Sequence, residues 1–224
     1  MRGQSITDPV GKLDLDMILE NLSQIKYKNY FSQYKNAFLH FCEWQNIKLS
    51  DNTLNAIEEL EKGTRRKNRK LETIQFKEVE SKINNLRNKK LKLCYQVLLA
   101  TGLRVSELAS INTSDIIATN DYITFSFVAK GGKSQTSTIN ALEYPIAYKN
   151  VKKLIENKPD GKLFYSTVYL QKNAKKLGFK CHDLRRACAK LEYRKTKSKE
   201  AVKTKLRHSS VKTSNIYIKS KIKF

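Results

Sequence analysis

The sequence LRHSSVKTSNIYIK (206–219), near the end of the chain, has His208 nine positions before Tyr217. Two earlier stretches carry side chains of a related kind. ATGLRVSEL (100–108) holds an arginine in an apolar frame, and HDLRR (182–186) holds a histidine and two arginines. Arginine binds phosphate oxygens as a planar fork, histidine transfers protons near neutral pH, and a tyrosine hydroxyl can act as a nucleophile. Together the three stretches indicate chemistry on a phosphodiester.

The charge of the chain indicates the same class of partner. Its 224 residues include 44 Lys and Arg against 21 Asp and Glu, a net charge of +23, which is typical of nucleic-acid binding. A basic protein that charge merely keeps soluble and a basic protein of the membrane surface stay open on composition alone. No run of about 18 apolar residues occurs and residues 1–16 lack the apolar core of a signal peptide, so we expect a cytoplasmic protein without a membrane span.

The cysteines Cys42, Cys94, Cys181 and Cys188 show no paired C-x-x-C spacing. This spacing predicts buried, reduced thiols rather than a disulfide framework. Cys181, His182 and Cys188 could act as metal ligands, but no second cluster completes a tetrahedral zinc site. The sequence therefore predicts no metal site.

The first 63 residues have the pattern of a small helical domain. Apolar residues recur at helical spacing over 13–25, 27–44 and 51–62, and Gly63 suits the left-handed turn just past a helix end. The middle helix carries an aromatic stripe that we expect to lie in the core: Tyr30, Tyr34, Phe38, Phe41 and Trp44.

A basic segment, residues 64–72, follows this domain. Five of the seven residues in TRRKNRK (64–70) are basic, so the segment cannot form a core of its own. We interpret it as an interdomain linker, either a solvated charge run or a segment that lies along DNA phosphates. Its candidate DNA contacts are Arg65, Arg66, Lys67, Arg69 and Lys70.

The rest of the chain, 73–224, is predicted to be mainly α with a small antiparallel sheet. A β-hairpin is expected from the strands 122–128 and 134–139, with Lys130 to Lys133 in the turn. Helices are expected near 73–86, 89–101, 103–111, 143–157, 166–176, 183–195, 198–206 and 210–218.

The spacing of the charged residues in this part indicates how they act together. Arg104 and Glu107 stand three residues apart on a helix, where they can pair. Arg104 could be an ordinary surface arginine, but a partly buried guanidinium in an apolar frame needs a carboxylate or phosphate partner. His182 and Arg185 have H-x-x-R spacing, which points both side chains the same way. Two arginines, proton-transfer groups and Tyr217 form the set that a phosphodiester transition state needs.

With these motifs the chain resembles the tyrosine recombinases, the family of phage integrases and Xer-type recombinases, over nearly its whole length. ATGLRVSEL matches the family's first catalytic arginine with its supporting acid, and AKGGK (129–133) matches the GKGxK turn, with Lys130 rather than Lys133 as the catalytic lysine. HDLRR matches H-x-x-R, and LRHSSVKTSNIY matches LGHSSxxTTxxY. The resemblance assigns as catalytic Arg104, Lys130, His182, Arg185, His208 and Tyr217, with Glu107 in support.

The resemblance implies a mechanism. Tyr217 would attack the scissile phosphate and form a 3′-phosphotyrosine while the two arginines bind the phosphoryl oxygens. Lys130 would protonate the leaving 5′-oxygen, His182 would transfer protons, and His208 would hydrogen-bond the phosphate. Because the covalent link conserves the bond energy, no ATP, metal ion or other cofactor would be needed.

The resemblance also implies the partner. A two-domain clamp, with residues 1–63 as core-binding domain, 64–72 as connector and 73–224 as catalytic domain, would hold double-stranded DNA. The DNA would carry paired inverted half-sites, and the protein would be a homotetramer on DNA and a monomer or dimer when free. Further candidate DNA contacts are Lys133, Arg186 and Arg207.

Three features depart from the family pattern. Arg207 stands where glycine usually precedes the histidine, and either crowds the turn or adds a phosphate contact. From the short N-terminal domain we expect no separate arm-binding module. Because residues 218–224 follow Tyr217 in this sequence, the C-terminal helix that many relatives lend to a neighbour is expected to be absent or reduced.

Two other functions stay open at this point. A type IB topoisomerase shares the catalytic set and would relax supercoils without specific sites, although the length and the Xer-like motifs favour the recombinase. In a non-catalytic basic DNA-binding protein, Tyr217 would be a core aromatic residue.

Overall fold

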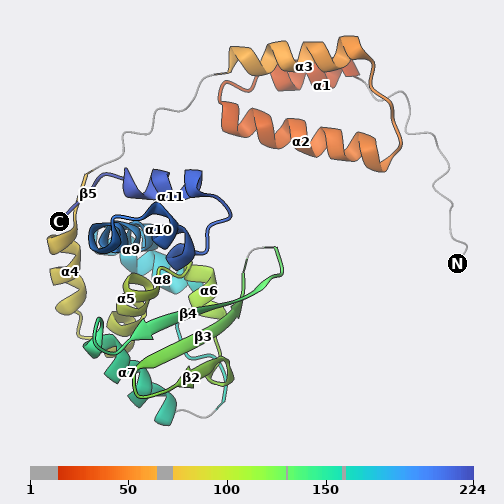
Figure 1. The fold of residues 1–224 in the computed structure, drawn as a ribbon. Coiled ribbons are helices and arrows are strands. Elements are labelled where there is room, and N and C mark those ends of the chain that lie inside the picture. The colour runs from red at the N-terminus through yellow and green to blue at the C-terminus, as the bar shows by residue number, and fades with distance from the viewer. Residues whose placement is uncertain (1–14, 65–72, 130, 158–159) are drawn as a thin grey trace, which may run out of the picture. The chain divides into compact units, whose positions relative to one another are not determined.

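The computed structural model describes residues 15–64, 73–129, 131–157 and 160–224, and Figure 1 shows its helices and strands. The chain divides into two compact units, residues 1–70 and 71–224. The candidate DNA contacts of the basic segment all fall within 65–72, outside the described residues. The domain boundaries at 63 and 73 stay a prediction.

The first unit consists of α1 (Leu15–Ser23), α2 (Lys28–Trp44) and α3 (Asp51–Gly63). Its core is small, with Leu22, Phe31 and Ile57 buried at the centre. Ser50 caps α3 by accepting a hydrogen bond from the Thr53 amide at 3.2 Å. Such caps satisfy amide groups that the first helical turn leaves unpaired.

The prediction that the aromatic stripe of α2 lies in the core is wrong for three of its five members. Tyr30, Tyr34 and Trp44 are 51%, 62% and 75% exposed, whereas Phe31 is fully buried and Phe38 packs against the core. The reason is geometric, because α2 has only two neighbouring helices in its unit and can bury one face. The residue after Tyr30 is rotated by about 100° and takes that face.

The second unit is mainly helical with a small antiparallel sheet, as predicted. Its helices, several of which surround the central α5 and α9, are α4 (Phe76–Asn84), α5 (Lys89–Thr101), α6 (Val105–Ser110), α7 (Pro145–Glu156), α8 (Thr167–Lys176), α9 (Cys181–Thr196), α10 (Lys199–Leu206) and α11 (Val211–Ile218). One large apolar cluster fills this unit, with Val97, Leu98 and Leu108 completely buried within it.

The sheet has the order β2 (Ile116–Ala118), β3 (Tyr122–Val128) and β4 (Ser134–Asn140). The hairpin β3–β4 is the predicted one, and its alternation buries Ile123, Phe125 and Phe127 against the core. Phe125 pairs with Ser137 across the hairpin. Strand β2 was not predicted, because three residues are too few to show alternation.

A second strand pair was also missed. The short strands β1 (Ile74–Gln75) and β5 (Ile222–Lys223) pair in parallel, and the ring of Phe224 lies 4.8 Å from that of Phe76. The tail after α11 therefore packs against the beginning of its own unit. No helix in the described ranges combines the length and apolar composition that crossing a membrane requires.

Gly102 sets the turn between α5 and α6. Its φ of +62° is left-handed, and a Cβ atom there would lie 2.4 Å from Leu206 Cδ2, so any other residue would be strained at this position. This turn therefore touches the end of α10. The four cysteines, as predicted, are buried free thiols.

Candidate active site

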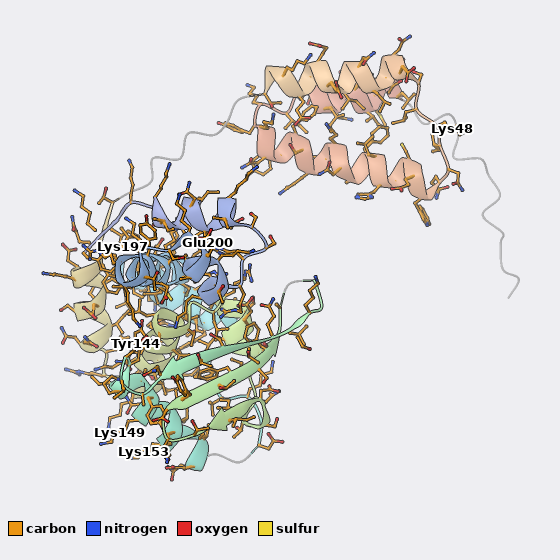
Figure 2. The ribbon with its side chains drawn as sticks, viewed as in Figure 1. Lys48, Tyr144, Lys149, Lys153, Lys197 and Glu200 are labelled. Carbon is orange, nitrogen blue, oxygen red and sulfur yellow. The ribbon has the colours of Figure 1, made fainter. Side chains whose placement is uncertain are left out.

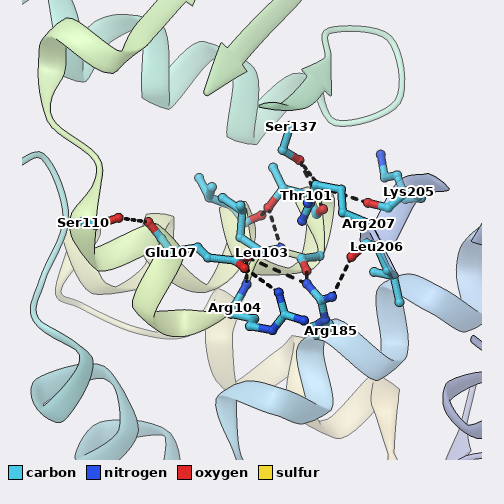
Figure 3. Close-up of polar contacts among 12 residues, drawn as sticks. Thr101, Leu103, Arg104, Glu107, Ser110, Ser137, Arg185, Lys205, Leu206 and Arg207 are labelled. Carbon is cyan, nitrogen blue, oxygen red and sulfur yellow. Dashed lines mark hydrogen bonds and ion pairs between the residues drawn. The ribbon is translucent and has the colours of Figure 1, made fainter. Parts of the chain in front are cut away.

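Arg185 in α9 is the centre of the site. Its side chain is 1% exposed, and it donates from Nη1 to the carbonyl of Gly102 and from Nη2 to the carbonyl of Leu206 at 2.6 Å. Figure 3 shows these bonds between α9 and two turns. One buried guanidinium thus joins the turns after α5 and α10 to α9.

Arg104 is the cap residue directly before α6 and lies beside Arg185 (Figure 3). The carboxylate of Glu107, which is 3% exposed, accepts from Arg104 Nη1 at 2.6 Å and from the Arg104 amide at 2.7 Å. The predicted pair is therefore confirmed. Glu107 also lies 4.0 Å from Arg185 Nη1, so one acid faces both guanidinium groups. The Arg104 side chain remains 37% exposed and accessible to a ligand.

Tyr217 in α11 lies among the other site residues. Its ring centroid is 4.6 Å from that of His208 and 5.2 Å from that of His182. Arg185 Cζ lies 5.9 Å from the Tyr217 ring centroid. Residues of HDLRR and of LRHSSVKTSNIYIK thus meet at one phenol ring, which is only partly buried.

His208 is buried, with 7% of its surface exposed. Its Nδ1 lies 3.0 Å from Ser214 Oγ, and its Nε2 has no hydrogen-bond partner among the described residues. Burial, together with the positive charges of Arg185, Arg104 and Arg207, lowers the pKa of His208 to about 4. The imidazole is therefore neutral at neutral pH.

This pKa predicts a pH-dependent stability. Between pH 6.5, the ordinary pKa of histidine, and pH 4, the unfolded chain binds a proton at His208 that the folded protein does not. The contribution of a neutral His208 is complete above pH 6.5 and is lost as the pH falls to 4, on the order of 2–3 kcal/mol. Urea unfolding of wild type and His208→Asn from pH 7.5 to 4 checks this. The difference in unfolding free energy should shrink as the pH falls, and a constant difference would contradict it.

The remaining basic residues of HDLRR lie at the surface. His182 is exposed at the beginning of α9, with one side toward Tyr217. Arg186 is partly exposed and pairs with Asp183 at 3.0 Å. Asp183 also accepts from the Lys180 amide at 2.9 Å, which fixes the first turn of α9.

The hairpin turn contributes one described lysine. Lys133 is exposed, and its carbonyl accepts from the Ala129 amide at 2.9 Å. Lys130, the lysine assigned to the chemistry, lies outside the described residues. Gly131 and Gly132 have φ of +91° and +76°, which explains the two glycines of AKGGK.

Arg207, predicted to contact DNA phosphates, makes hydrogen bonds within its own unit, and the DNA contact stays a prediction. Its Nη1 donates to Ser137 Oγ at 2.9 Å and to the Lys205 carbonyl at 3.0 Å, so the guanidinium faces the sheet (Figure 3). The backbone at this residue is left-handed, with φ 55°.

A cavity of about 530 Å³ opens beside the site. Its lining includes Arg104, His182 and Arg185, together with Lys175 and Lys180. Neither lysine was predicted from the sequence. Lys180 lies two residues before His182 and Lys175 lies in the last turn of α8, so basic residues near the motif were the available signal.

A mainly helical unit with a small antiparallel sheet, with Tyr217 beside Arg185 and two histidines and with Arg104 joined to Arg185 through Glu107, defines the class as the tyrosine recombinase type of catalytic domain. Residues 72–223 match the model of the phage integrase family. The chain therefore belongs to that family.

A tyrosine recombinase XerH of Campylobacter jejuni is 31% identical over 161 residues, which cover 61% of this chain and 42% of the relative. The chain thus matches less than half the length of that relative. Three solved structures share the fold: the XerH recombinase bound to a palindromic difH substrate, the Tn1549 transposon integrase with circular intermediate DNA, and a lambda integrase dimer bound to a core site. Their TM-scores are 0.62, 0.62 and 0.55.

Their identities are 21%, 15% and 18%, and they cover 93%, 93% and 94% of this chain. The chain in turn covers 69%, 82% and 81% of them. At such low identity the three structures support the architecture of the chain.

Proposed function

We propose that this chain is a site-specific DNA recombinase that cleaves and rejoins DNA through a 3′-phosphotyrosine intermediate. The observation that carries the proposal is the Tyr217 ring, which lies against His208 and His182 and within 5.9 Å of the buried Arg185. A phenol is a weak nucleophile at its ordinary pKa, and a cationic surrounding favours its attack. The names of its relatives, recombinases and integrases, agree with this activity.

In the proposed step, the Tyr217 oxygen attacks the phosphorus and its proton passes to His182. The bond from phosphorus to the 5′-oxygen breaks, and Lys130 protonates that oxygen. The strand then remains attached to Tyr217 through its 3′-phosphate until a 5′-hydroxyl attacks in return. Since the phosphodiester bond is exchanged rather than spent, we expect no requirement for ATP or a metal ion.

Two buried polar atoms support a place for the phosphate. Arg185 Nε and His208 Nε2 have no hydrogen-bond partner in the part of the chain that is described. Buried polar groups are rarely left unpaired, and non-bridging phosphate oxygens would accept from both. Arg104, held by Glu107 at the rim of the cavity, would supply the second fork to the same oxygens.

The expected partner is double-stranded DNA with paired inverted half-sites, bound by four copies in the cytoplasm. Residues 71–224 hold 32 Lys and Arg against 12 Asp and Glu, whereas residues 15–64 hold five Lys against seven Asp and Glu. We therefore expect the second unit and the basic segment to supply most of the phosphate contacts. The first unit would add fewer.

A plasmid assay tests the function. Supercoiled plasmids would carry two copies, one copy or no copy of a candidate crossover site, an inverted repeat sought in the DNA that flanks the gene. If the chain is a recombinase, recombined products should form only from the plasmid with two sites, together with a protein–DNA adduct that resists denaturation. Relaxation of every plasmid alike would instead indicate a topoisomerase. Binding without an adduct would indicate a non-catalytic protein.

A further inference from the structure

Arg207 has an unusual backbone for its type. It ends α10 with φ 55° and ψ 45°, in the left-handed region that is unfavourable for residues other than glycine. Glycine would therefore suit the turn better than arginine. The presence of arginine calls for a role of its side chain.

The side chain connects the turn to the sheet. Arg207 Nη1 donates to Ser137 Oγ in β4 and to the Lys205 carbonyl in α10, and its Cζ lies 5.3 Å from the centroid of the Phe127 ring in β3. Ser137 Oγ in turn donates to the Thr101 carbonyl at 3.3 Å, at the end of α5. The guanidinium is thus bonded to one hairpin and to its own helix end.

These bonds run parallel to those of Arg185. Arg185 holds the turns at Gly102 and Leu206 from the side of α9, and Arg207 holds the neighbouring residues from the side of the sheet (Figure 3). The turn that leads into His208 is therefore fixed from two sides. The His208 amide donates to the Lys203 carbonyl at 3.0 Å, so a shift of this turn moves the imidazole.

The surroundings of the Arg207 charge argue against a role in stabilising the fold alone. Its Nε and Nη2 are buried and have no hydrogen-bond partner within the described residues. Burial and the nearby charge of Arg185 lower its pKa to about 10, while the charge of Glu107 acts in the opposite sense. A buried cation without a bonded acid is costly to maintain.

We infer that Arg207 is a positioning residue, which ties the turn carrying His208 to the β3–β4 hairpin and so holds His208 against Tyr217. This inference rests on the proposed function. It assigns Arg207 a role inside the protein and not at the DNA phosphates. A neighbour displaced by about 1 Å at a reacting centre can slow a reaction up to about a hundredfold.

The test is single-turnover cleavage of a nicked suicide substrate at saturating protein, together with the salt dependence of DNA binding. Arg207→Gly should cleave at least about tenfold more slowly. Its slope of log affinity against log salt should equal that of the wild type, whereas loss of a phosphate contact would reduce the slope by about 0.9. Arg207→Lys, whose ammonium can donate to the same two oxygens, should retain most of the rate.

Lys197→Gly is the matched control. Lys197 ends α9 in the same left-handed conformation, with φ 53°, but it is exposed at the surface (Figure 2). Its replacement changes the backbone in the same way without removing a tether, so cleavage should be unchanged. Ser137→Ala should slow cleavage when made in the wild type, but should slow it little further when made in Arg207→Gly.

Three results would overturn the inference. Arg207→Gly could cleave at the wild-type rate, its salt slope could be reduced by one phosphate contact, or Lys197→Gly could slow cleavage as much as Arg207→Gly does. If Arg207→Gly does not fold, wild-type cleavage by Ser137→Ala would overturn it. The NMR signals of His208, which we expect the Tyr217 ring at 4.6 Å to shift, give a readout without catalysis. In Arg207→Gly they should move toward those of the exposed His40. The two proposals can fail separately. If the wild type forms no adduct but the His208 signals still move in Arg207→Gly, the proposed function is refuted and the positioning role of Arg207 remains.

Discussion

We expect Tyr217→Phe to abolish covalent adduct formation with a suicide substrate and to leave DNA binding intact. The change removes one oxygen and keeps the ring that packs beside His208 and His182. Loss of the nucleophile should reduce single-turnover cleavage by at least about 10⁴-fold. Denaturing gels of the trapped adduct measure the yield, and a binding titration measures the affinity.

The matched control for this change is Tyr193→Phe. Tyr193 and Tyr217 both pack against the same small cluster around Val202 and Leu206, so each variant loses a hydroxyl beside the same apolar residues. The control should form adduct at the wild-type rate. A normal yield from Tyr217→Phe would refute the assignment of the nucleophile.

Arg185→Lys is expected to have the second large effect, on both the rate of cleavage and the stability of the fold. Arg104→Lys separates these two effects. An ammonium cannot replace the planar fork, so either variant should lose on the order of 2–4 kcal/mol of transition-state stabilisation. Arg185 also holds the carbonyls of Gly102 and Leu206 in the interior. Arg185→Lys should therefore also lower the free energy of unfolding, by roughly 1–3 kcal/mol. Arg104 is partly exposed, and its variant should be nearly as stable as the wild type.

Single-turnover cleavage and urea unfolding of the two variants check this pair. Equal rates in Arg185→Lys and wild type would remove Arg185 from the chemistry. Equal destabilisation by both variants would show that Arg185 does not act as the link between the two turns.

Much of the fold follows from local patterns. The α5 and α9 helices were predictable because their apolar residues recur at helical spacing, and the β3–β4 hairpin because Phe125 and Phe127 alternate with exposed residues. The strands β1, β2 and β5 were not, since two or three residues carry no periodicity. Pairing of Ile74 with Ile222 joins positions at opposite ends of the unit, which no local pattern reveals.

The site was predictable as a set of residue types and not as a geometry. Motif order identified Arg185 and Tyr217, but the burial of Arg185 depends on turns that are distant in sequence. The hydrogen bond from Arg207 to Ser137 joins residues of α10's end and β4, which no local pattern reveals. The exposure of Tyr34 likewise depends on how many helices pack around α2.

The central claim, a 3′-phosphotyrosine at Tyr217, is tested most directly by mapping the trapped adduct. The adduct would be digested with nuclease and trypsin, and the modified peptide identified by mass spectrometry. Trypsin releases Tyr217 in TSNIYIK (213–219), where it is the only tyrosine. The predicted result is a nucleotide linked through its 3′-phosphate to this peptide, with a free 5′-hydroxyl on the released strand. A linkage to another peptide, or through a 5′-phosphate, would contradict the account.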